Sequence, residues 1–235
     1  YVQGRQGEEF AFFSGKKNND KRQLSQRQRE KSSLLLLCIS FQQQLRRRRR
    51  DIKTMSWRSH GTSTNDSLID ALEKNNLIAS RDVVGKAMRK VDRKCYVESA
   101  DANEAYRDHP LQIGSNATIS APHMHAMCLE LSKEYVVVND DGDDASGGYG
   151  NGRVLDVGSG SGYLVACFAE MMMQQNVSTS SKVVGIEHIE SLVDQSIENL
   201  KQDGKQEILR SGLITITKGD GRLGYEAFEP YTLIH

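Results

Sequence analysis

The sequence predicts an α/β fold, namely a doubly wound, Rossmann-like sheet preceded by N-terminal helices. Three observations support this prediction. The apolar stretch 154–157 leads into three alternate glycines, and a helical pattern then runs to Met173. Two more β-branched stretches follow, 182–187 and 213–218, with a helical pattern over 189–200 between them. Because such alternation is typical of parallel strands with right-handed crossovers, we expect a fourth strand over 231–235.

The charge of the chain is unevenly distributed. Its 31 basic and 31 acidic residues balance overall, yet residues 1–54 hold 14 Lys and Arg against 5 Asp and Glu, whereas residues 55–235 hold 17 against 26. We therefore expect a basic, disordered leader over residues 1–54 and one folded domain over residues 55–235. An acidic domain does not favour nucleic-acid binding, which requires concentrated positive charge.

The basic leader allows three interpretations. An Arg-rich segment is typical of an organelle transit peptide or of a nuclear address. The third interpretation is translated upstream sequence, which we favour because the chain opens on Tyr1 and its composition changes at Met55. The apolar island 34–39 is far shorter than the roughly 20 residues that span a bilayer, so we expect no membrane span. We expect a cytoplasmic domain, or an organellar or nuclear one if the leader is a targeting segment.

No stretch of the sequence is typical of a metal site. The cysteines lack C-x-x-C spacing, so neither zinc nor a disulfide framework is predicted, and we expect Cys128 and Cys167 in the core. His123 and His125 stand two residues apart and would diverge on a helix. The acidic, glycine-rich stretch 139–152 lacks the ligand spacing of a calcium loop, so we expect a flexible surface loop there.

Two amphipathic helices are expected at the start of the domain. The first covers 65–76, with Thr64 or Asn65 as its N-cap. The second is capped by Ser80, and its buried stripe consists of Val83, Val84, Ala87, Met88 and Val91. The charged stretch 92–110 has no clear period and is expected to lie over the surface.

A polar block, 112–126, precedes a third helix. Pro122 suits the first turn of that helix, whose expected buried stripe is Met124, Cys128, Leu131 and Tyr135. Thr118 and Ser120 stand just before it, where backbone N–H groups favour an anion. The alternative is that Ser120 is only the N-cap of the helix.

The glycine turn and the ends of the next strands are the candidate ligand site. Gly158, Gly160 and Gly162 bring the backbone and a helix N-terminus close to a nucleotide-like ligand, although such turns also occur with nothing bound. Glu187 ends the second strand, where an acid can accept ribose hydroxyls; a solvated carboxylate is the alternative. Asp220 follows the third strand and would lie beside an adenine edge.

Four segments resemble the protein-L-isoaspartate (D-aspartate) O-methyltransferase family, whose members are class I S-adenosylmethionine-dependent methyltransferases. They are Met55–Ser59, Ala117–Ala126, Leu155–Gly162 and Gly219–Tyr225. The block A-T-I-S-A-P-H-M-H-A is specific to that family, whereas the G-x-G-x-G motif is shared by many methyltransferases. The resemblance covers residues 55–235. The family has further strands beyond this point, so we expect a methyltransferase sheet whose C-terminal strands are missing from this chain.

The resemblance implies S-adenosyl-L-methionine as cofactor and isoaspartyl-containing peptides and proteins as substrates. The implied reaction methylates the free α-carboxylate of L-isoaspartyl or D-aspartyl residues in damaged proteins and so initiates their repair. Ser120 is the implied catalytic residue, and Thr118, Ser120 and His125 are the implied substrate-binding residues. The implied cofactor-binding residues are Ala117, Thr118, Ile119, Ser120, His125, Asp156, Gly158, Ser159, Gly160, Ser161, Gly162, Glu187, His188, Asp220 and Gly221.

The chemistry of the reactants suits this assignment. An α-carboxyl group has a pKa of about 3.5, so at neutral pH it is already an anion and needs no general base. Positioning of the reactants, worth about 7 to 11 kcal/mol in favourable cases, is then the main task of the protein. We therefore expect Ser120 to orient the acceptor rather than to act as a nucleophile.

Two other classes of protein are considered. A nicotinamide-dependent oxidoreductase would share the strand, turn and acid, but its fingerprint is G-x-G-x-x-G rather than the G-x-G-x-G found here. A non-catalytic binding module with the same fold is the other alternative. We expect a monomer without nucleic-acid or membrane partners.

Overall fold

The protein is described by a computed structural model, which covers residues 63–79, 82–98, 102–136, 152–175 and 179–235. All of these lie in the unit Trp57–His235. The predicted leader, the segment Met55–Ser59 and nearly all of the stretch 139–152 lie outside the described residues.

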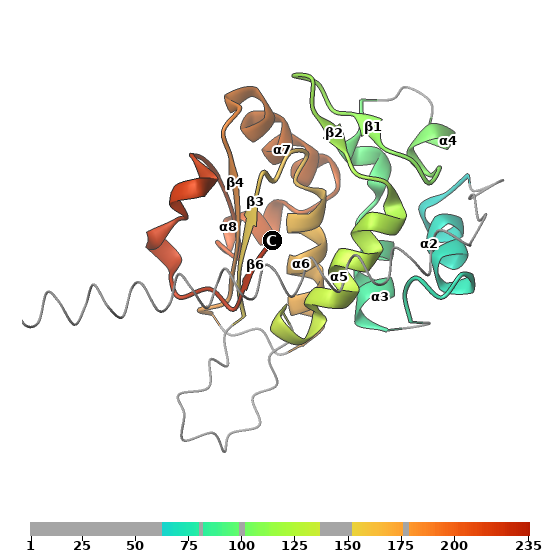
Figure 1. The fold of residues 1–235 in the computed structure, drawn as a ribbon, viewed down its shortest axis with the longest axis horizontal. Coiled ribbons are helices and arrows are strands. Elements are labelled where there is room, and N and C mark those ends of the chain that lie inside the picture. Colours follow the sequence, from blue (N-terminus) through green and yellow to red (C-terminus); the bar gives the residue numbers. More distant parts are fainter. Residues whose placement is uncertain (1–62, 80–81, 99–101, 137–151, 176–178) are drawn as a thin grey trace, which may run out of the picture. The chain divides into compact units, whose positions relative to one another are not determined.

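A parallel sheet of four strands forms the centre of the domain (Figure 1). The strands are β3 (Arg153–Val157), β4 (Lys182–Glu187), β5 (Ile214–Lys218) and β6 (Leu233–Ile234), in the order β5-β4-β3-β6. The predicted parallel α/β fold is thus confirmed. Because β4 and β6 lie on opposite sides of β3, the chain order reverses there, and the carboxyl end of β3 is where ligands bind in such sheets.

The two faces of the sheet are covered differently. Three helices pack on one face, as Figure 1 shows for the first two: α5 (Pro122–Val136), α6 (Tyr163–Met173) and α7 (Glu190–Gln202). All of α6 except Met173 is buried, because the helix lies between the sheet and its neighbours α3 and α5. On the other face, Tyr225, Phe228 and Tyr231 pack against Leu155, Val184 and Ile186.

Short elements complete this arrangement. On the second face, the segment between β5 and β6 forms only the 3-10 turns η2 (Gly221–Leu223) and η3 (Glu226–Phe228). The helix α8 (Gln206–Arg210) leads into β5. Cys128 and Cys167 are buried, as predicted.

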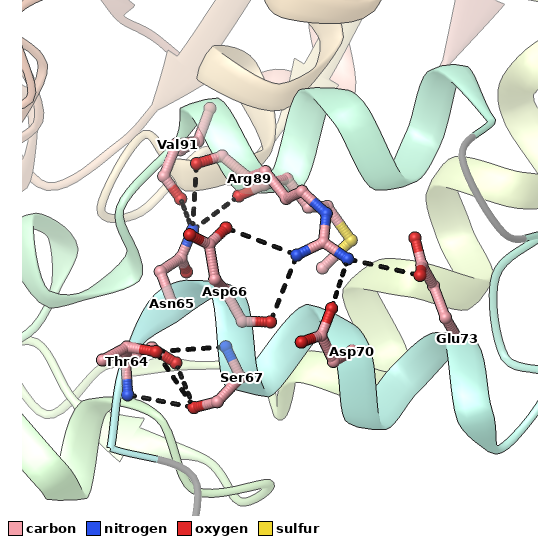
Figure 2. Close-up of polar contacts among 9 residues, drawn as sticks. Thr64, Asn65, Asp66, Ser67, Asp70, Glu73, Arg89 and Val91 are labelled. Carbon is pink, nitrogen blue, oxygen red and sulfur yellow. Dashed lines mark hydrogen bonds and ion pairs between the residues drawn. The ribbon is translucent and has the colours of Figure 1, made fainter.

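Two helices at the start of the domain are joined by polar contacts (Figure 2). They are α2 (Asn65–Lys74) and α3 (Val83–Lys90). Thr64 caps α2 through a capping box with Ser67, as predicted. The neighbouring Asn65 has another role, because its amide donates to the carbonyls of Met88, Arg89 and Val91 at 2.9, 3.2 and 3.3 Å. This side chain therefore closes the end of α3.

The Arg89 side chain adds a second link between the same helices. It pairs with Asp66, Asp70 and Glu73 of α2, at 3.3, 2.6 and 3.2 Å (Figure 2). The N-cap predicted for α3 was wrong: the cap is Asp82, which accepts from the N–H of Val83 at 2.7 Å, whereas Ser80 lies outside the described residues.

Two other sequence predictions were wrong. The stretch 92–110 contains the 3-10 turn η1 (Arg93–Tyr96) and the helix α4 (Ala102–Ala105), and Arg93 and Tyr96 are fully buried rather than on the surface. The Tyr96 hydroxyl donates to Asp203 at 2.8 Å, which ties η1 to the end of α7. The buried face of α5 also differs from the predicted stripe: Tyr135 is 46% exposed, while the buried positions include His125, Leu129, Ser132 and Val136.

A hairpin precedes α5. Its strands are β1 (Leu111–Gln112) and β2 (Thr118–Ile119), and its tip contains Ser115 and Asn116 with positive φ angles of 50° and 58°. The Ser115 hydroxyl lies 2.9 Å from that of Ser191 at the start of α7. The hairpin therefore places Thr118 next to the carboxyl ends of the sheet strands.

Candidate active site

The glycine turn after β3 leaves open space for a ligand. Gly158 and Gly162 have φ angles of +79° and +84°, which L side chains rarely adopt. A Cβ added at Gly162 would lie 3.2 Å from Ser196 of α7, whereas one at Gly158 would meet nothing within 4 Å. Gly162 thus serves close helix packing, and Gly158 borders free volume.

Two cavities meet at this turn. The first, of about 110 Å³, is lined by Ile113, Thr118, Ile119, Ser120, His125, Asp156, Gly158, Ser159, Gly160, Ser161, Tyr163, Leu164 and His235. The second, of about 640 Å³, is lined by Val157, Gly158, Ile186, His188, Lys218, Gly219, Asp220, Gly221 and Arg222. Since Gly158 lines both, one elongated ligand can occupy the two cavities together.

Ser120 has a free hydroxyl at the first cavity. Ser120 is exposed, and its side chain makes no hydrogen bond with any described residue. The first turn of α5 is capped instead by Asp108, which accepts from the N–H of His123 at 2.9 Å. Ser120 is therefore not the N-cap of the helix, and its hydroxyl remains available to a ligand.

Buried ionisable groups surround the first cavity. Burial and the nearby Arg93 guanidinium hold the pKa of His125 well below its usual value, so this imidazole is neutral. His235 bonds to Asp156 at 2.8 Å. Burial lowers the pKa of His235, but its hydrogen bonds to Asp156 and Cys128 outweigh burial and raise that pKa to about 10. An imidazolium and a carboxylate therefore lie side by side here.

Glu187, at the end of the neighbouring strand β4, stabilises the glycine turn. Its buried carboxylate accepts from the backbone N–H groups of Gly160, His188 and Ile189 at 3.1, 2.7 and 3.0 Å. The imidazole Nδ1 of His188 lies 2.9 Å from the same carboxylate. Glu187 lines neither cavity, so its predicted contact with ribose hydroxyls stays a prediction.

Asp220 lies in the second cavity together with an arginine. Arg222 donates from its Nε at 2.9 Å and from its Nη2 at 2.6 Å to the two carboxylate oxygens. These side-chain hydrogen bonds hold the pKa of Asp220 at about 2, so the group is an anion at neutral pH. A ligand amine that donates to the Asp220 carboxylate has to share the two carboxylate oxygens with Arg222.

Most of the predicted site residues line one of the two cavities. Three do not: Glu187 and Gly162, described above, and Ala117, whose backbone closes the hairpin turn by bonding to Gly114 and Ile113. Sequence reasoning missed several lining residues, among them Ile113, Tyr163, Leu164, Arg222 and His235. Tyr163 and Leu164 follow the glycine motif directly, so their place in the chain could have indicated them.

The residues at the turn fit an S-adenosyl ligand. The Ser159 hydroxyl is buried and has no hydrogen-bond partner among the described residues, and Ser159 lines the first cavity beside the open volume at Gly158. Among the described residues, no cluster of three or more His, Cys, Asp or Glu side chains is placed to hold a metal. None of the helices that the structure describes is long and apolar enough to cross a membrane.

The fold and the site define a class of protein. A parallel sheet with an open glycine turn after its first strand, and an acid at the end of the next, is typical of Rossmann-like, S-adenosylmethionine-dependent methyltransferases. The sequence profile of the family described as Protein-L-isoaspartate(D-aspartate) O-methyltransferase (PCMT) matches residues 63–235. The chain belongs to this family, and it is an S-adenosylmethionine-dependent protein carboxyl O-methyltransferase.

Individual relatives agree with the family match. Protein-L-isoaspartate O-methyltransferase 1 of Arabidopsis thaliana is 40% identical over 179 residues, which cover 76% of this chain and 69% of the relative. The Caenorhabditis elegans protein-L-isoaspartate O-methyltransferase is 41% identical over 181 residues, which cover 77% and 70%. A Plasmodium falciparum protein of this kind, solved in complex with S-adenosyl-L-homocysteine, has a TM-score of 0.58 and 32% identity over 71% of this chain and 68% of its own.

Proposed function

We propose that this domain transfers a methyl group to the free α-carboxylate of L-isoaspartyl and D-aspartyl residues in damaged proteins, with Ser120 orienting the acceptor. One observation carries the assignment of Ser120. Its hydroxyl, unbonded within the described residues, lines the small cavity that the glycine turn also lines. An acceptor held by this hydroxyl lies beside the turn that holds the donor.

In this proposal the two cavities bind different ends of the methyl donor. S-adenosylmethionine, when bound, supplies a methyl group already activated by a sulfonium. The second cavity, with Asp220, Gly221 and His188, suits the adenosine end. The first cavity, with Ser159 and His125, suits the amino-acid end. Glu187 holds the turn between them and is proposed to accept from a ribose hydroxyl at the lone-pair site that its three backbone N–H bonds leave open.

The protein holds the acceptor without a general base. A carboxylate is already ionised at neutral pH, so the chain has to orient it and keep water from it. The hydroxyls of Thr118 and Ser120 can each donate one hydrogen bond without neutralising the anion. His125 is neutral and therefore adds a donor without a full charge.

Isoaspartyl-containing peptides and proteins are the proposed partners of the domain. The net negative charge of residues 55–235, with 17 basic and 26 acidic residues, supports the absence of a nucleic-acid partner. We also propose that the domain acts as a cytoplasmic monomer. Size-exclusion chromatography with light scattering, and imaging of the tagged full chain, test these two proposals.

The change Ser120→Ala tests the role of the hydroxyl. We expect kcat for an isoaspartyl peptide to fall by about 10- to 100-fold, since a hydrogen bond to a charged group is worth about 1.5–3 kcal/mol. The Kd for S-adenosylhomocysteine, measured by calorimetry, should change much less. Thr179→Ala is the control, because Thr179 is also an exposed hydroxyl residue but lines neither cavity. Unchanged turnover in Ser120→Ala would refute the assignment.

A further inference from the structure

Arg93 is a buried cation behind the first cavity. Its side chain is fully buried in η1. Among the described residues no carboxylate lies within ion-pair distance of the guanidinium, and its Nε has no hydrogen-bond partner. Asp108 attracts the guanidinium from beyond ion-pair distance, but a charge buried without a directly paired carboxylate is costly, so Arg93 is a residue for which a role beyond stability can be sought.

The guanidinium joins three parts of the site. Its Nη2 donates to the Ser120 carbonyl at 2.9 Å, and its Nη1 lies 3.3 Å from Nδ1 of His125. Its central carbon lies 5.7 Å from the centroid of the Tyr163 ring, on which the His125 ring also packs at 4.8 Å. One side chain thus connects the residue after β2, the first turn of α5 and the start of α6.

The contact with His125 determines which nitrogen carries the hydrogen. A guanidinium has five N–H donors and no acceptor, so Nδ1 of His125 has to present its lone pair. The neutral ring then carries its hydrogen on Nε2. An imidazolium at this position would set N–H against N–H and cation against cation. The lowered pKa of His125, due first to burial and then to Arg93, agrees with a neutral ring.

The other nitrogen of His125 is available to a ligand. Nε2 makes no hydrogen bond with a described residue, and it is not one of the fully buried atoms that lack a hydrogen-bond partner. His125 lines the first cavity. We propose that Arg93 is a positioning residue for methyl transfer: it fixes the His125 tautomer so that Nε2–H faces a carboxylate in the cavity, and it holds Ser120 by its carbonyl.

Either of two molecules can supply the carboxylate that accepts from Nε2–H, because both carry this group. It belongs either to the acceptor or to the amino-acid end of the donor. The kinetic consequence of the proposal rests on the proposed function, whereas the tautomer does not. The two parts can therefore fail separately.

Nitrogen NMR of the full chain labelled with ¹⁵N-histidine tests the tautomer. The chain has six histidines, and the spectrum of His125→Gln identifies the signals of His125. We expect Nε2 of His125 to be protonated and Nδ1 unprotonated in the wild type, and a mixture of tautomers in Arg93→Met. A wild-type ring protonated on Nδ1, or an unchanged single tautomer in Arg93→Met, overturns the proposal. The wild-type spectrum decides even if the variant does not fold.

Kinetics test the consequence for the reaction. We expect Arg93→Met to lower kcat for an isoaspartyl peptide at least about tenfold, and Arg93→Lys to restore part of it, because an ammonium is also a pure donor. A larger change in the peptide KM identifies the acceptor carboxylate, and a larger change in the Kd of S-adenosylhomocysteine identifies that of the donor. If wild-type protein has the expected tautomer but no isoaspartyl turnover, the proposed function fails and the tautomer assignment stands.

Lys205→Met is the matched control. Lys205 is also a buried cation, but it pairs with Glu170 at 2.9 Å and lines neither cavity. We expect this variant to be less stable, with the His125 tautomer and the kcat of its folded fraction unchanged. An equal loss of kcat in Lys205→Met would show that losing any buried cation suffices, which would contradict the positioning role.

Discussion

Ser120 and Glu187, both predicted site residues, differ in the hydrogen bonds that their side chains already make. Ser120 keeps its hydroxyl free at the cavity, whereas Glu187 already bonds three backbone N–H groups. A carboxylate has about four lone-pair sites, so about one remains on Glu187 for a ligand, and Nδ1 of His188 at 2.9 Å competes for it. Its loss should therefore affect both the empty turn and the bound ligand, which separates it from Ser120.

The change Glu187→Ala tests this double role. We expect the free energy of unfolding to fall by about 1–3 kcal/mol, because the N–H groups of Gly160, His188 and Ile189 lose their acceptor. The affinity for S-adenosylhomocysteine should fall about tenfold or more. Urea unfolding and calorimetry measure the two effects. Glu198→Ala, at an exposed position of α7, is the control; full affinity in Glu187→Ala would rule out the ribose contact.

Residue types at the strand ends could be predicted from the sequence, but Arg93 could not. Glu187 and Asp220 each follow a recognisable strand, and Ser120 stands before a proline that starts a helix. Arg93 lies in a stretch with many charges and no period, where a cation normally faces solvent. Its burial depends on packing against Tyr163 and the residues around the hairpin, which local sequence does not determine.

At the scale of elements, the glycine turn offers a comparison of two positions with the same backbone strain. Gly158 and Gly162 have nearly equal φ angles, so an alanine at either should cost about 1–2 kcal/mol. At Gly158 the new methyl enters open volume at the cavities, and at Gly162 it meets Ser196. We expect Gly158→Ala to weaken S-adenosylhomocysteine binding more than Gly162→Ala does.

Thermal melts with and without S-adenosylhomocysteine measure this difference. Gly162→Ala should have the lower melting temperature without ligand, because its methyl adds a close contact with α7 to the strain. Gly158→Ala should show the smaller rise in melting temperature on adding ligand. The opposite ranking in both experiments would mean that the free space at Gly158 is not the ligand site.

The long elements could be predicted because their patterns are strong. The β-branched runs of β3, β4 and β5 and the helical period of α7 gave the right type and order. The hairpin β1–β2 was missed because a two-residue strand has no measurable period. The stripe of α5 was misplaced because its apolar residues, such as Leu131 and Tyr135, occur on more than one side of the helix.

At the scale of the whole molecule, two histidines give stability opposite dependences on pH. Burial, with Arg93, lowers the pKa of His125 in the folded state, so its unfolded form binds a proton more readily. That contribution is complete above about pH 6.5 and is lost below it. The pKa of His235 is raised to about 10, so its contribution is complete below about pH 6.5 and is lost as the pH rises toward 10.

We therefore expect these two histidines to favour maximal stability near pH 6.5. Below that pH, the free energy of unfolding should fall by up to about 1.4 kcal/mol per pH unit through His125. Urea unfolding of wild type and of His125→Gln over a pH series measures this term. The variant should lose the acid-side slope and keep the alkaline side; identical acid slopes in both proteins would contradict a neutral, buried His125.

The meeting of the two cavities at one residue affects how a ligand is retained. Gly158 is the one described residue that lines both, so a long ligand is held at its two ends and crosses a single backbone position. Each bound end tethers the other and raises its effective concentration, so the joined molecule binds far more tightly than either half. Free adenosine and free methionine should accordingly compete poorly with the intact cofactor, although each could fill a cavity.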